Sequence, residues 1–393
     1  MTAHSLPMRT SPPPYTFLSY ASANLAEANR LDYGLSSHGV RLWRDLRGLP
    51  SGPQLEGFEE AILLARGYVI MATPEAAQSE VITKKELPAA YKKERSHTGY
   101  FILPAFYMRP TEASKAFRGV IDVPLGNYAG AIISQSDHGR GIQKLARMAL
   151  DRLYPTLDQP VSLCLSSYFR PVADIPLDFT HLWKQRRLSK ITAQSVLASS
   201  RDIHRWLLER GVRTVSLSLR AHLPVALAFG LGFPDTGGLR VVVDDGASGW
   251  SSSTPAAVSF YKDCQEGRLG SHAIAVRISF SQDVVPASRA FLDTLDMRPR
   301  AILTYSSRTA PGSSAIKSPR EGARIVRSIV EDIKRKARSF SAHEIHLFIS
   351  CPSPMAFLLG SQMNAVGDVF LYDFDESRGV YYPCGNTGAA SRI

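Results

Sequence analysis

The chain has 393 residues, of which 44% are hydrophobic and 21% charged, and this composition excludes a largely disordered or fibrous protein. Its length suits roughly two or three domains, each with a core of its own. The formal net charge of +11 favours an anionic partner such as a nucleotide, a nucleic acid or a membrane surface. The dense basic run at 334–338, however, is more typical of a solvated helix end than of a DNA-binding surface.

Cysteine spacing and hydropathy argue against two further classes of protein. The four cysteines lie far apart, and none has the spacing to another cysteine or to a histidine that zinc sites need. No apolar run approaches the ~18 residues of a membrane span. Residues 1–14 lack the apolar core of a secretion signal and are expected to be a disordered leader. We therefore expect no structural metal, no membrane partner and a location in the reduced cytoplasm.

Strands and helices alternate along the first part of the chain. Apolar periodicity predicts, in chain order, a strand at 15–20, a helix at 24–37, a strand at 40–43, a helix at 56–65 and strands at 68–72 and 100–106. Such alternation argues for an α/β fold in which helices cover both faces of a parallel sheet.

Four short segments of this part, in order and at suitable spacing, resemble the TIR domain family. They are FLSYAS at 17–22, GVRLWRD at 39–45, a loop ending in Ser51 and Gly52, and TPEAAQSEVITKKEL at 73–87. The resemblance covers roughly residues 15–155. It implies a TIR domain with a flavodoxin-like parallel sheet.

The resemblance to TIR domains implies one of two activities. Some TIR domains are adaptors, and others break the nicotinamide–ribose bond of NAD+ with the help of a carboxylate near that ribose. The departing nicotinamide leaves an oxocarbenium-like sugar, which an anionic oxygen stabilises. By this resemblance Glu86 is the candidate catalytic residue, NAD+ is the substrate, and no further cofactor is needed. The candidate substrate-binding residues are Ser19, Tyr20, Trp43, Asp45 and Leu46.

The segment around Glu86 departs from the common S-x-W-x-x-x-E form. Val81 stands in place of the tryptophan, and Glu86 follows Ser79 by seven residues instead of six. One residue turns an α-helix by about 100°, so Glu80 remains a rival carboxylate. Trp43 is either a face for a ring of the substrate or part of the sheet core. The loop that follows it is either a plain turn or a TIR–TIR contact at the rim of the pocket.

The remainder of the chain contains an internal duplication. The aligned pairs are 161–167 with 301–307, 214–219 with 345–350, 223–230 with 353–360 and 240–245 with 369–374. The third pair matches proline, alanine and glycine in place, and the first pair consists of predicted strands that end in two serines. We therefore expect two fused α/β units at about 160–250 and 300–385.

In sheets of this kind, ligands collect beyond the carboxyl ends of the strands, where helix N-termini offer unpaired N–H groups and a partial positive charge. The two pairs of serines and the segments 222–224 and 352–354 are predicted to lie there. If these strand ends of the two units face each other, they make one pseudo-symmetric pocket. A phosphate-linked ring of repeated nucleotides would suit it.

Residues 156–393 resemble the SAVED domain, a fusion of two CARF-like Rossmann units, most clearly in HLFISCPSPMAFLLGSQMN at 346–364. The resemblance implies binding of a cyclic oligonucleotide of the cyclic tri-adenylate kind, made by a nucleotidyltransferase on infection. Candidate contacts are Ser166, Ser167, Arg201, His222, Leu223, Trp250, Ser306, Ser307 and Ser353. Simpler roles exist for several of them: the serines as turn formers, Arg201 as a solvated charge at a helix start, and Trp250 as a loop anchor.

Together the two resemblances indicate a TIR–SAVED effector of bacterial cyclic-oligonucleotide antiphage signalling (CBASS). We expect the messenger to drive self-association, into a closed ring or an open filament, and so to activate an NAD+ nucleosidase that depletes NAD+. One alternative is a non-catalytic TIR scaffold that recruits a partner. Another is direct nucleic-acid binding through the positive charge, although we expect no DNA partner. The ring size of the messenger, and hydrolysis or cyclisation of the product, stay open.

Overall fold

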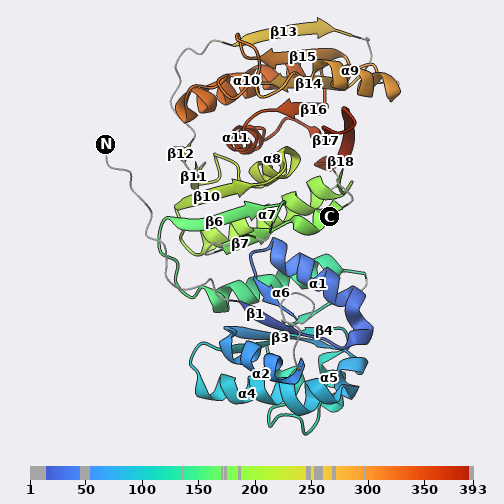
Figure 1. Cartoon of the computed structure of the whole chain (residues 1–393), viewed down its shortest axis with the longest axis vertical. Coiled ribbons are helices and arrows are strands. Elements are labelled where there is room, and N and C mark those ends of the chain that lie inside the picture. The colour runs from blue at the N-terminus through green and yellow to red at the C-terminus, as the bar shows by residue number, and fades with distance from the viewer. Residues whose placement is uncertain are drawn as a thin grey trace. The chain divides into compact units, whose positions relative to one another are not determined.

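The computed structural model describes residues 15–44, 54–134, 136–169, 171, 175–184, 187–244, 249–251, 260–267, 271–295 and 297–388 (Figure 1). The chain divides into two compact units. The first consists of Met1–Thr156 and Val172–Pro176, and the second of Leu157–Pro171 and Leu177–Ile393.

The first unit is built on a five-stranded sheet in the order β2-β1-β3-β4-β5, in which every neighbouring pair is parallel. The strands are β1 (Thr16–Ser19), β2 (Leu42–Trp43), β3 (Gly67–Ala72), β4 (Phe101–Phe106) and β5 (Ala131–Ile132). Strands β3 and β4 are buried along their whole length. Strands of parallel sheets show this burial because helices cover both faces. The predicted parallel α/β sheet is confirmed.

Helices cover the two faces of this sheet. Helix α1 contacts α6 on one face, and α2 contacts α4 on the other (Figure 1). The α-helices are α1 (Leu25–Ser37), α2 (Gln54–Leu64), α3 (Pro74–Gln78), α4 (Leu87–Ser96), α5 (Pro110–Ala116) and α6 (His138–Leu153). The shorter turns are η1 (Ser22–Asn24), η3 (Ile82–Glu86) and η4 (Leu125–Asn127).

The second unit contains two sheets of similar topology. Their orders are β12-β11-β10-β6-β7 and β13-β15-β14-β16-β17-β18. Each sheet has three neighbouring parallel strands followed by an antiparallel one, β6-β10-β11 with β12 and β14-β16-β17 with β18. This order supports two copies of one α/β unit.

The first copy contains β6 (Val161–Ser166), β7 (Ile175–Asp178), α7 (Thr192–Glu209), β10 (Thr214–Arg220), α8 (Leu223–Gly232), β11 (Arg240–Asp244) and β12 (Gly249–Trp250). Its insertion holds η5 (Thr180–Leu182) and the paired strands β8 (Trp183–Lys184) and β9 (Arg187–Leu188). The second sheet and its helices contain β13 (Tyr261–Glu266), β14 (Ala273–Ser279), α9 (Val285–Thr294), β15 (Ala301–Ser306), α10 (Pro319–Ser339), β16 (Glu344–Ser350), α11 (Ser353–Gln362), β17 (Asp368–Asp375) and β18 (Val380–Asn386).

Strand pairing corrects the expected alignment of the two copies. Ser166 of β6 pairs with Arg220 of β10, and Ser279 of β14 pairs with Ser350 of β16. Strand β14 is therefore the counterpart of β6, whereas β15 lies one strand further out, in the position that β7 has in the first sheet. The second copy thus begins near 273 and not near 300.

Hydrogen bonds just beyond these strands support the corrected alignment. The N–H of Ser167 donates to Arg220 O at 3.1 Å, and the N–H of Phe280 donates to Ser350 O at 2.8 Å. The expected pairing of 161–167 with 301–307 was therefore wrong. Two successive serines are common wherever a strand ends in a turn, so they do not show which strand they follow.

The two copies pack against each other through α8 and α11, which are apolar and buried on all sides. A β-carbon at Gly230 would lie 2.1 Å from Phe357 O, and one at Gly360 would lie 2.1 Å from Leu227 O. Each helix thus has a glycine where the backbone of the other approaches most closely. The glycines aligned in the sequence therefore have a reciprocal packing role.

Helix α10 begins and packs as its sequence predicts. The hydroxyl of Ser318 accepts the backbone N–H of Glu321 at 3.2 Å, which satisfies one of the unpaired donors at the helix start. Ile325, Ile329 and Ile333 lie on the buried face.

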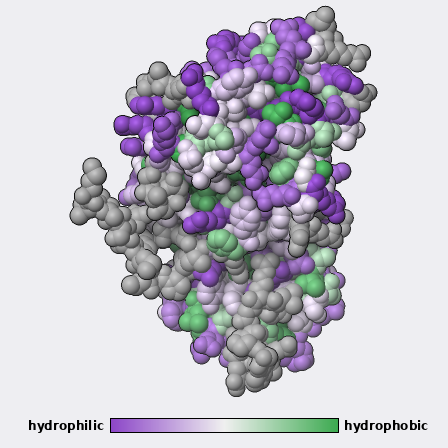
Figure 2. Space-filling view, turned by 45° about the horizontal axis from the view of Figure 1, so that its top comes forward, coloured by the Kyte–Doolittle hydropathy of each residue, from purple (hydrophilic) through white to green (hydrophobic). Residues whose placement is uncertain are grey.

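Hydrophilic side chains dominate the face seen in Figure 2, and apolar residues are scattered among them. Exposed large apolar side chains include Leu63 and Leu64 at the end of α2 and Tyr168 and Phe169 after β6. Within the described ranges, no helix combines the length and the hydropathy that a membrane crossing requires.

Candidate functional site

The first unit has a cleft of about 700 Å³ at the carboxyl end of β1. Its lining includes Ser19 and Tyr20 from β1 and the turn after it, Glu75 from α3, Ser79, and Glu86 from η3. The carboxyl edge of a parallel sheet is where ligands of open α/β folds bind. The cleft therefore brings three of the predicted residues together at the expected edge of the sheet.

Ser19 holds Glu86 at the inner end of this cleft. Ser19 Oγ donates a hydrogen bond of 2.6 Å to Glu86 Oε2, and Glu86 is only 7% exposed. This length is typical of a hydroxyl that donates to an ionised carboxylate. The carboxylate is thus oriented toward the strand end.

A π turn takes up the extra residue between Ser79 and Glu86. Residues Ile82–Glu86 form this turn, and the N–H of Leu87 donates to Ile82 O, five residues back. A π turn contains one residue more than an α turn, so Glu86 still faces β1 in spite of the seven-residue spacing. Such bulges are frequent at functional sites.

Two other carboxylates lie on the same segment. Glu80, the rival from the sequence, is exposed, forms an ion pair with Lys84 and does not line the cleft. Glu75 lines it but is exposed, and Asn24 Nδ2 donates to its Oε2 at 3.3 Å. A hydrogen bond from its own backbone N–H, followed by that from Asn24, lowers the pKa of Glu75. Of the carboxylates in the described lining, Glu86 is the buried one.

A buried tyrosine lies behind the Ser19–Glu86 pair. Tyr68 of β3 is fully buried and stacks on Phe17, with 5.7 Å between the ring centres. Burial, followed by the charge of Glu86, raises the pKa of Tyr68 well above its usual value. The phenol therefore stays neutral and keeps this wall low in polarity, which strengthens the electrostatic effect of a charge in the cleft.

The end of β2 is held against α1 by a buried ion pair. Arg44 Nε lies 3.0 Å from Asp32 Oδ2, and both side chains are almost fully buried. The Arg44 guanidinium also lies 5.9 Å from the centre of the Tyr20 ring. Asp45 and Leu46, predicted to contact the substrate, follow directly but lie outside the described residues.

Trp43 has the simpler of its two predicted roles. It does not line the described cleft. Its ring stacks on Phe17 at 5.0 Å and meets Phe58 edge to face at 6.3 Å. Trp43 is therefore a member of the aromatic cluster that supports the wall of the cleft.

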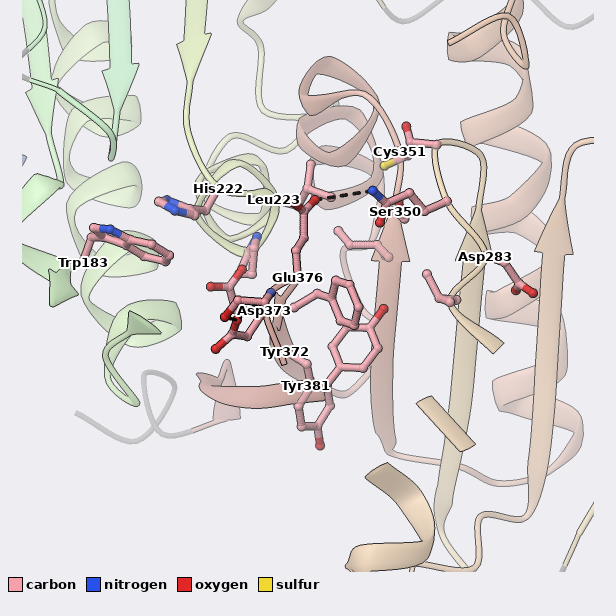
Figure 3. Close-up of a pocket in the computed structure, with 18 of the residues that line it drawn as sticks. Trp183, His222, Leu223, Asp283, Ser350, Cys351, Tyr372, Asp373, Glu376 and Tyr381 are labelled. Atoms are coloured by element: carbon pink, nitrogen blue, oxygen red, sulfur yellow. Dashed lines mark hydrogen bonds between the residues drawn. The ribbon is translucent and has the colours of Figure 1, made fainter. Parts of the chain in front are cut away.

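The second unit has a cavity of about 680 Å³ between its two copies (Figure 3). The first copy contributes Tyr168, Trp183 and the start of α8 at His222 and Leu223. The second contributes the turn after β14, the end of β16 and the end of β17. The cavity thus lies between the carboxyl ends of the strands of the two copies.

His222 is a neutral ring in the wall of this cavity. Its Nδ1 lies 2.7 Å from Ser167 Oγ, and its backbone N–H donates to the same oxygen at 3.0 Å. The imidazole lies between the rings of Tyr168 and Trp183, with centres 4.0 Å away on each side. Burial lowers the pKa of His222 to about 4. Both faces of the His222 ring are therefore covered by aromatic rings, and the imidazole carries no positive charge at neutral pH.

The wall of the cavity that the second copy contributes is acidic. Asp283, Asp373, Asp375 and Glu376 line it, and the described lining contains neither lysine nor arginine. Burial, reinforced by the charge of Asp375, raises the pKa of Asp373 to about 7. Asp373 is therefore partly protonated near neutral pH and can both donate and accept hydrogen bonds.

The serines that end β6 shape the turn below the cavity. Ser167 holds His222, as described above. Ser166 Oγ donates to Arg220 O at 3.2 Å and accepts the N–H of Phe169 at 3.3 Å. Neither serine belongs to the described lining. Ser167 instead positions His222, which lines the cavity, and Ser166 fixes the turn that carries Tyr168.

The serines of the second copy lie away from the cavity. Ser306 and Ser307 end β15, which lies one strand outside β14, and Ser307 Oγ is 2.9 Å from Thr309 Oγ1. The prediction that they contribute to this pocket fails because the alignment placed them on the wrong strand. Ser353, at the start of α11, donates to Ala221 O at 3.5 Å and links the two copies.

Arg201 and Trp250 are placed differently from the prediction. Arg201 lies within α7, not at its start, and lines a separate cavity of about 670 Å³ together with His204. Trp250 is 4% exposed, and a β-carbon at Gly322 would lie 2.2 Å from its ring. Trp250 therefore packs β12 against α10, which is the role of a loop anchor and not of a ligand contact.

Several cavity residues were missed in the sequence. Tyr168 and Trp183 lie in irregular segments that offer no periodicity, and Asp283 follows a strand that the alignment skipped. Asp373 lies in the aligned segment 369–374, but alternation along a strand does not show which face meets a cavity. Among the described residues, no group of histidine, cysteine and acidic side chains is arranged to hold a metal ion.

Two family models match the chain. Residues 16–131 match the TIR domain, and residues 199–385 match SAVED, the SMODS-associated sensor domain fused to various effectors. The chain therefore combines a TIR domain with a SAVED sensor domain. No curated protein matches it at a significant level.

Solved structures similar to the chain include SAVED/CARF-domain containing Cap4 receptors. The Acinetobacter baumannii receptor with the cyclic trinucleotide 3'3'3'-cAAA is 15% identical, with a TM-score of 0.51, over 94% of this chain and 86% of that one. The same receptor with 2'3'3'-cAAA has 15% identity and a TM-score of 0.49 over the same shares. A Moraxella osloensis receptor has 18% identity and a TM-score of 0.46 over 86% of each chain. The first of these supports the fold.

Proposed function

We propose that this protein is an NAD+ glycohydrolase that a cyclic oligonucleotide activates, and that it depletes NAD+ in CBASS antiphage defence. The observation that carries the catalytic half is the buried Glu86 carboxylate, which Ser19 holds at the mouth of the TIR sheet. The duplicated SAVED fold with its inter-copy cavity supports the sensory half.

The proposed reaction converts NAD+ and water into ADP-ribose, nicotinamide and a proton. The C1'–N bond breaks with its electron pair going to nicotinamide, and the sugar becomes oxocarbenium-like. Glu86 stabilises this positive charge, and it does so more strongly because its surroundings are buried. Water then adds at C1' and releases the proton.

The cavity between the SAVED copies is the proposed messenger site. Tyr168 and Trp183, whose rings flank His222, offer their outer faces for stacking of a base. Ser350 and Cys351 line the cavity just before the N-terminus of α11, and the partial positive charge of this helix end favours a phosphate. The Acinetobacter baumannii receptor of TM-score 0.51 was solved with the cyclic trinucleotide 3'3'3'-cAAA, and we propose a cyclic tri-adenylate as the activator here.

Activation is proposed to act through self-association of the liganded protein. A TIR loop around residues 45–51 of one molecule would complete the cleft of its neighbour. Asp45 and Leu46 belong to this loop. Electron microscopy with and without messenger distinguishes a ring from a filament, and single dispersed molecules in both samples would contradict the proposal.

The test is an NAD+ cleavage assay on the full chain with a panel of cyclic di-, tri- and tetranucleotides. We expect NAD+ loss that depends on one or more members of the panel. Glu86→Gln should lower the activated rate by about 100-fold or more, because it removes the negative charge from the site. Glu80→Gln, an exposed carboxylate on the same segment, is the matched control and should keep full activity.

A non-catalytic TIR scaffold is the second candidate, and the valine at position 81 favours it. Val81 lines the cleft where the family motif has a tryptophan. A scaffold would assemble with messenger yet leave NAD+ intact under the same conditions. NAD+ loss that is abolished by Glu86→Gln would exclude this candidate.

A further inference from the structure

The second SAVED copy contains another, smaller cavity, of about 230 Å³, between helix α9 and the outer strands of its sheet. Three arginines line it: Arg277 from β14, Arg289 from α9 and Arg298 from the segment before β15. Leu292 and Ile302 supply an apolar wall. The cavity thus combines cationic groups with an apolar surface.

Arg277 is the unusual member of this set. Only 3% of its surface is exposed, yet its Nε has no hydrogen-bond partner. The side chain forms no ion pair or hydrogen bond with any residue in the described part of the chain. Buried charges in proteins are ordinarily paired, because an isolated charge in the interior is strongly unfavourable. Among the described residues, Arg277 therefore has no anionic partner.

The charged neighbours of Arg277 within the described ranges do not supply this partner. Burial, followed by repulsion from Arg289, lowers the pKa of Arg277. Asp283 and Asp293 act in the opposite direction, but neither forms an ion pair with Arg277. Asp293 is itself exposed to solvent.

We propose that this cavity binds an oxyanion, the phosphate or carboxylate group of a small molecule, with Arg277 as its buried ligand. The planar guanidinium fork matches both groups in a bidentate manner. Arg289 and Arg298 add charge at the rim. The apolar wall of Leu292 and Ile302 holds the uncharged part of the molecule.

The size and charge of the cavity make its ligand different from the proposed messenger. Its 230 Å³ is below the range of about 300–1,000 Å³ of pockets that enclose drug-sized ligands. Three arginines and two acidic residues, Glu266 and Asp293, line it, so the formal net charge of the lining is 3 − 2 = +1, which matches one anionic group. The site therefore selects a small ligand with a single anionic group.

The test is calorimetric titration of the full chain with inorganic phosphate, AMP, acetate and hexanoate, each against potassium chloride at equal ionic strength. We expect saturable binding of at least one of these probes. Phosphate and AMP would identify a phosphate site, and acetate and hexanoate a carboxylate site. Tighter binding of hexanoate than of acetate would show a contribution from the apolar wall. The absence of saturable binding by all four would overturn the proposal.

Variants separate this cavity from other anion sites. Arg277→Met should abolish binding and, because it removes an unpaired buried charge, should not lower the thermal stability of the free protein. Arg298→Gln, at the exposed rim, should weaken binding about tenfold. Arg308→Gln changes an exposed arginine of the same copy that does not line the cavity, and it should bind like the wild type. Unchanged binding by Arg277→Met would refute the assignment.

Discussion

Ser19 Oγ donates to Glu86 Oε2 across 2.6 Å, and both residues are almost fully buried. This bond joins the end of β1 to a helical segment 67 residues later in the chain. It therefore sets the direction of the carboxylate.

We predict that Ser19→Ala lowers messenger-activated NAD+ cleavage by about 10- to 100-fold, because a hydrogen bond to a charged group contributes about 1.5–3 kcal/mol. The loss should fall on kcat more than on KM if the bond orients Glu86 for the transition state. Ser22→Ala, which changes another serine of the same cleft, should leave both constants near their wild-type values. Full activity of Ser19→Ala would show that Glu86 does not need this partner.

The π turn before Glu86 leads to a second prediction. Deletion of Lys84 removes one residue from this turn and should convert it to a regular α turn, which keeps Glu86 in the cleft. Lys84 is exposed and pairs with the exposed Glu80, so its loss costs little stability. We expect activity within a few-fold of wild type. Insertion of an alanine after Lys84 instead rotates Glu86 by about 100° and should abolish cleavage.

Circular dichroism and the NAD+ assay check both variants together. Helix content should be unchanged in each. Loss of activity in the deletion variant, with helix content preserved, would mean that the π geometry itself is required.

The alternation of strands and helices and the location of Glu86 could be predicted, because apolar periodicity and motif order are local properties of the chain. The strand Ala273–Ser279 could not be predicted from the sequence. Arg277 interrupts its apolar residues. In addition, β15 ends in two serines as β6 does, so the sequence comparison aligned β15 with β6 instead. Only the pairing of Ser279 with Ser350 shows which strand is the counterpart.

The cavity residues were harder to predict than the fold, because they depend on which surfaces meet. Trp250 in a polar loop looked like a ligand contact, but it fills the space above Gly322. Asp373 was visible as the end of a strand. Its importance follows from burial between two copies of the repeat, which no local pattern records.

A third prediction concerns the packing of the two SAVED copies. Gly230→Ala and Gly360→Ala each place a methyl group 2.1 Å from a carbonyl oxygen of the facing helix, so the helices must separate. Overpacking of this kind costs about 1–3 kcal/mol or more. Both variants should lower the free energy of unfolding of the SAVED domain in urea. Gly312→Ala, where a β-carbon meets nothing within 4 Å, should change it by less than about 0.5 kcal/mol. Equal stability of all three would contradict the close helix contact.

The acidic wall of the inter-copy cavity leads to a fourth prediction, on pH. Burial, with the nearby charge of Asp375, raises the pKa of Asp373 to about 7. The carboxyl is therefore charged above pH 7 and neutral below it. A phosphate-bearing messenger is repelled by the charged form. Its affinity should accordingly rise as the pH falls from 8 to 6, by at most about tenfold per pH unit for one linked proton.

Other groups that face Asp373 should not titrate in this window. His222 has a pKa lowered to about 4 by burial and stays neutral. Hydrogen bonding from Ser377 lowers the pKa of Asp375, which stays charged. Burial, followed by the charges of Asp283 and Asp373, raises the pKa of Tyr381, which stays protonated.

Equilibrium binding of cyclic tri-adenylate at several pH values and constant ionic strength measures this effect. In Asp373→Asn the side chain is neutral at every pH, so binding should be as tight at pH 8 as in the wild type at pH 6, and the pH dependence should disappear. Glu376→Gln is the matched control, since it removes a charge from the same wall but leaves Asp373 to titrate, and it should bind more tightly while keeping the slope. A wild-type affinity that does not change between pH 6 and 8 would mean that the messenger phosphates lie far from Asp373, toward the start of α11.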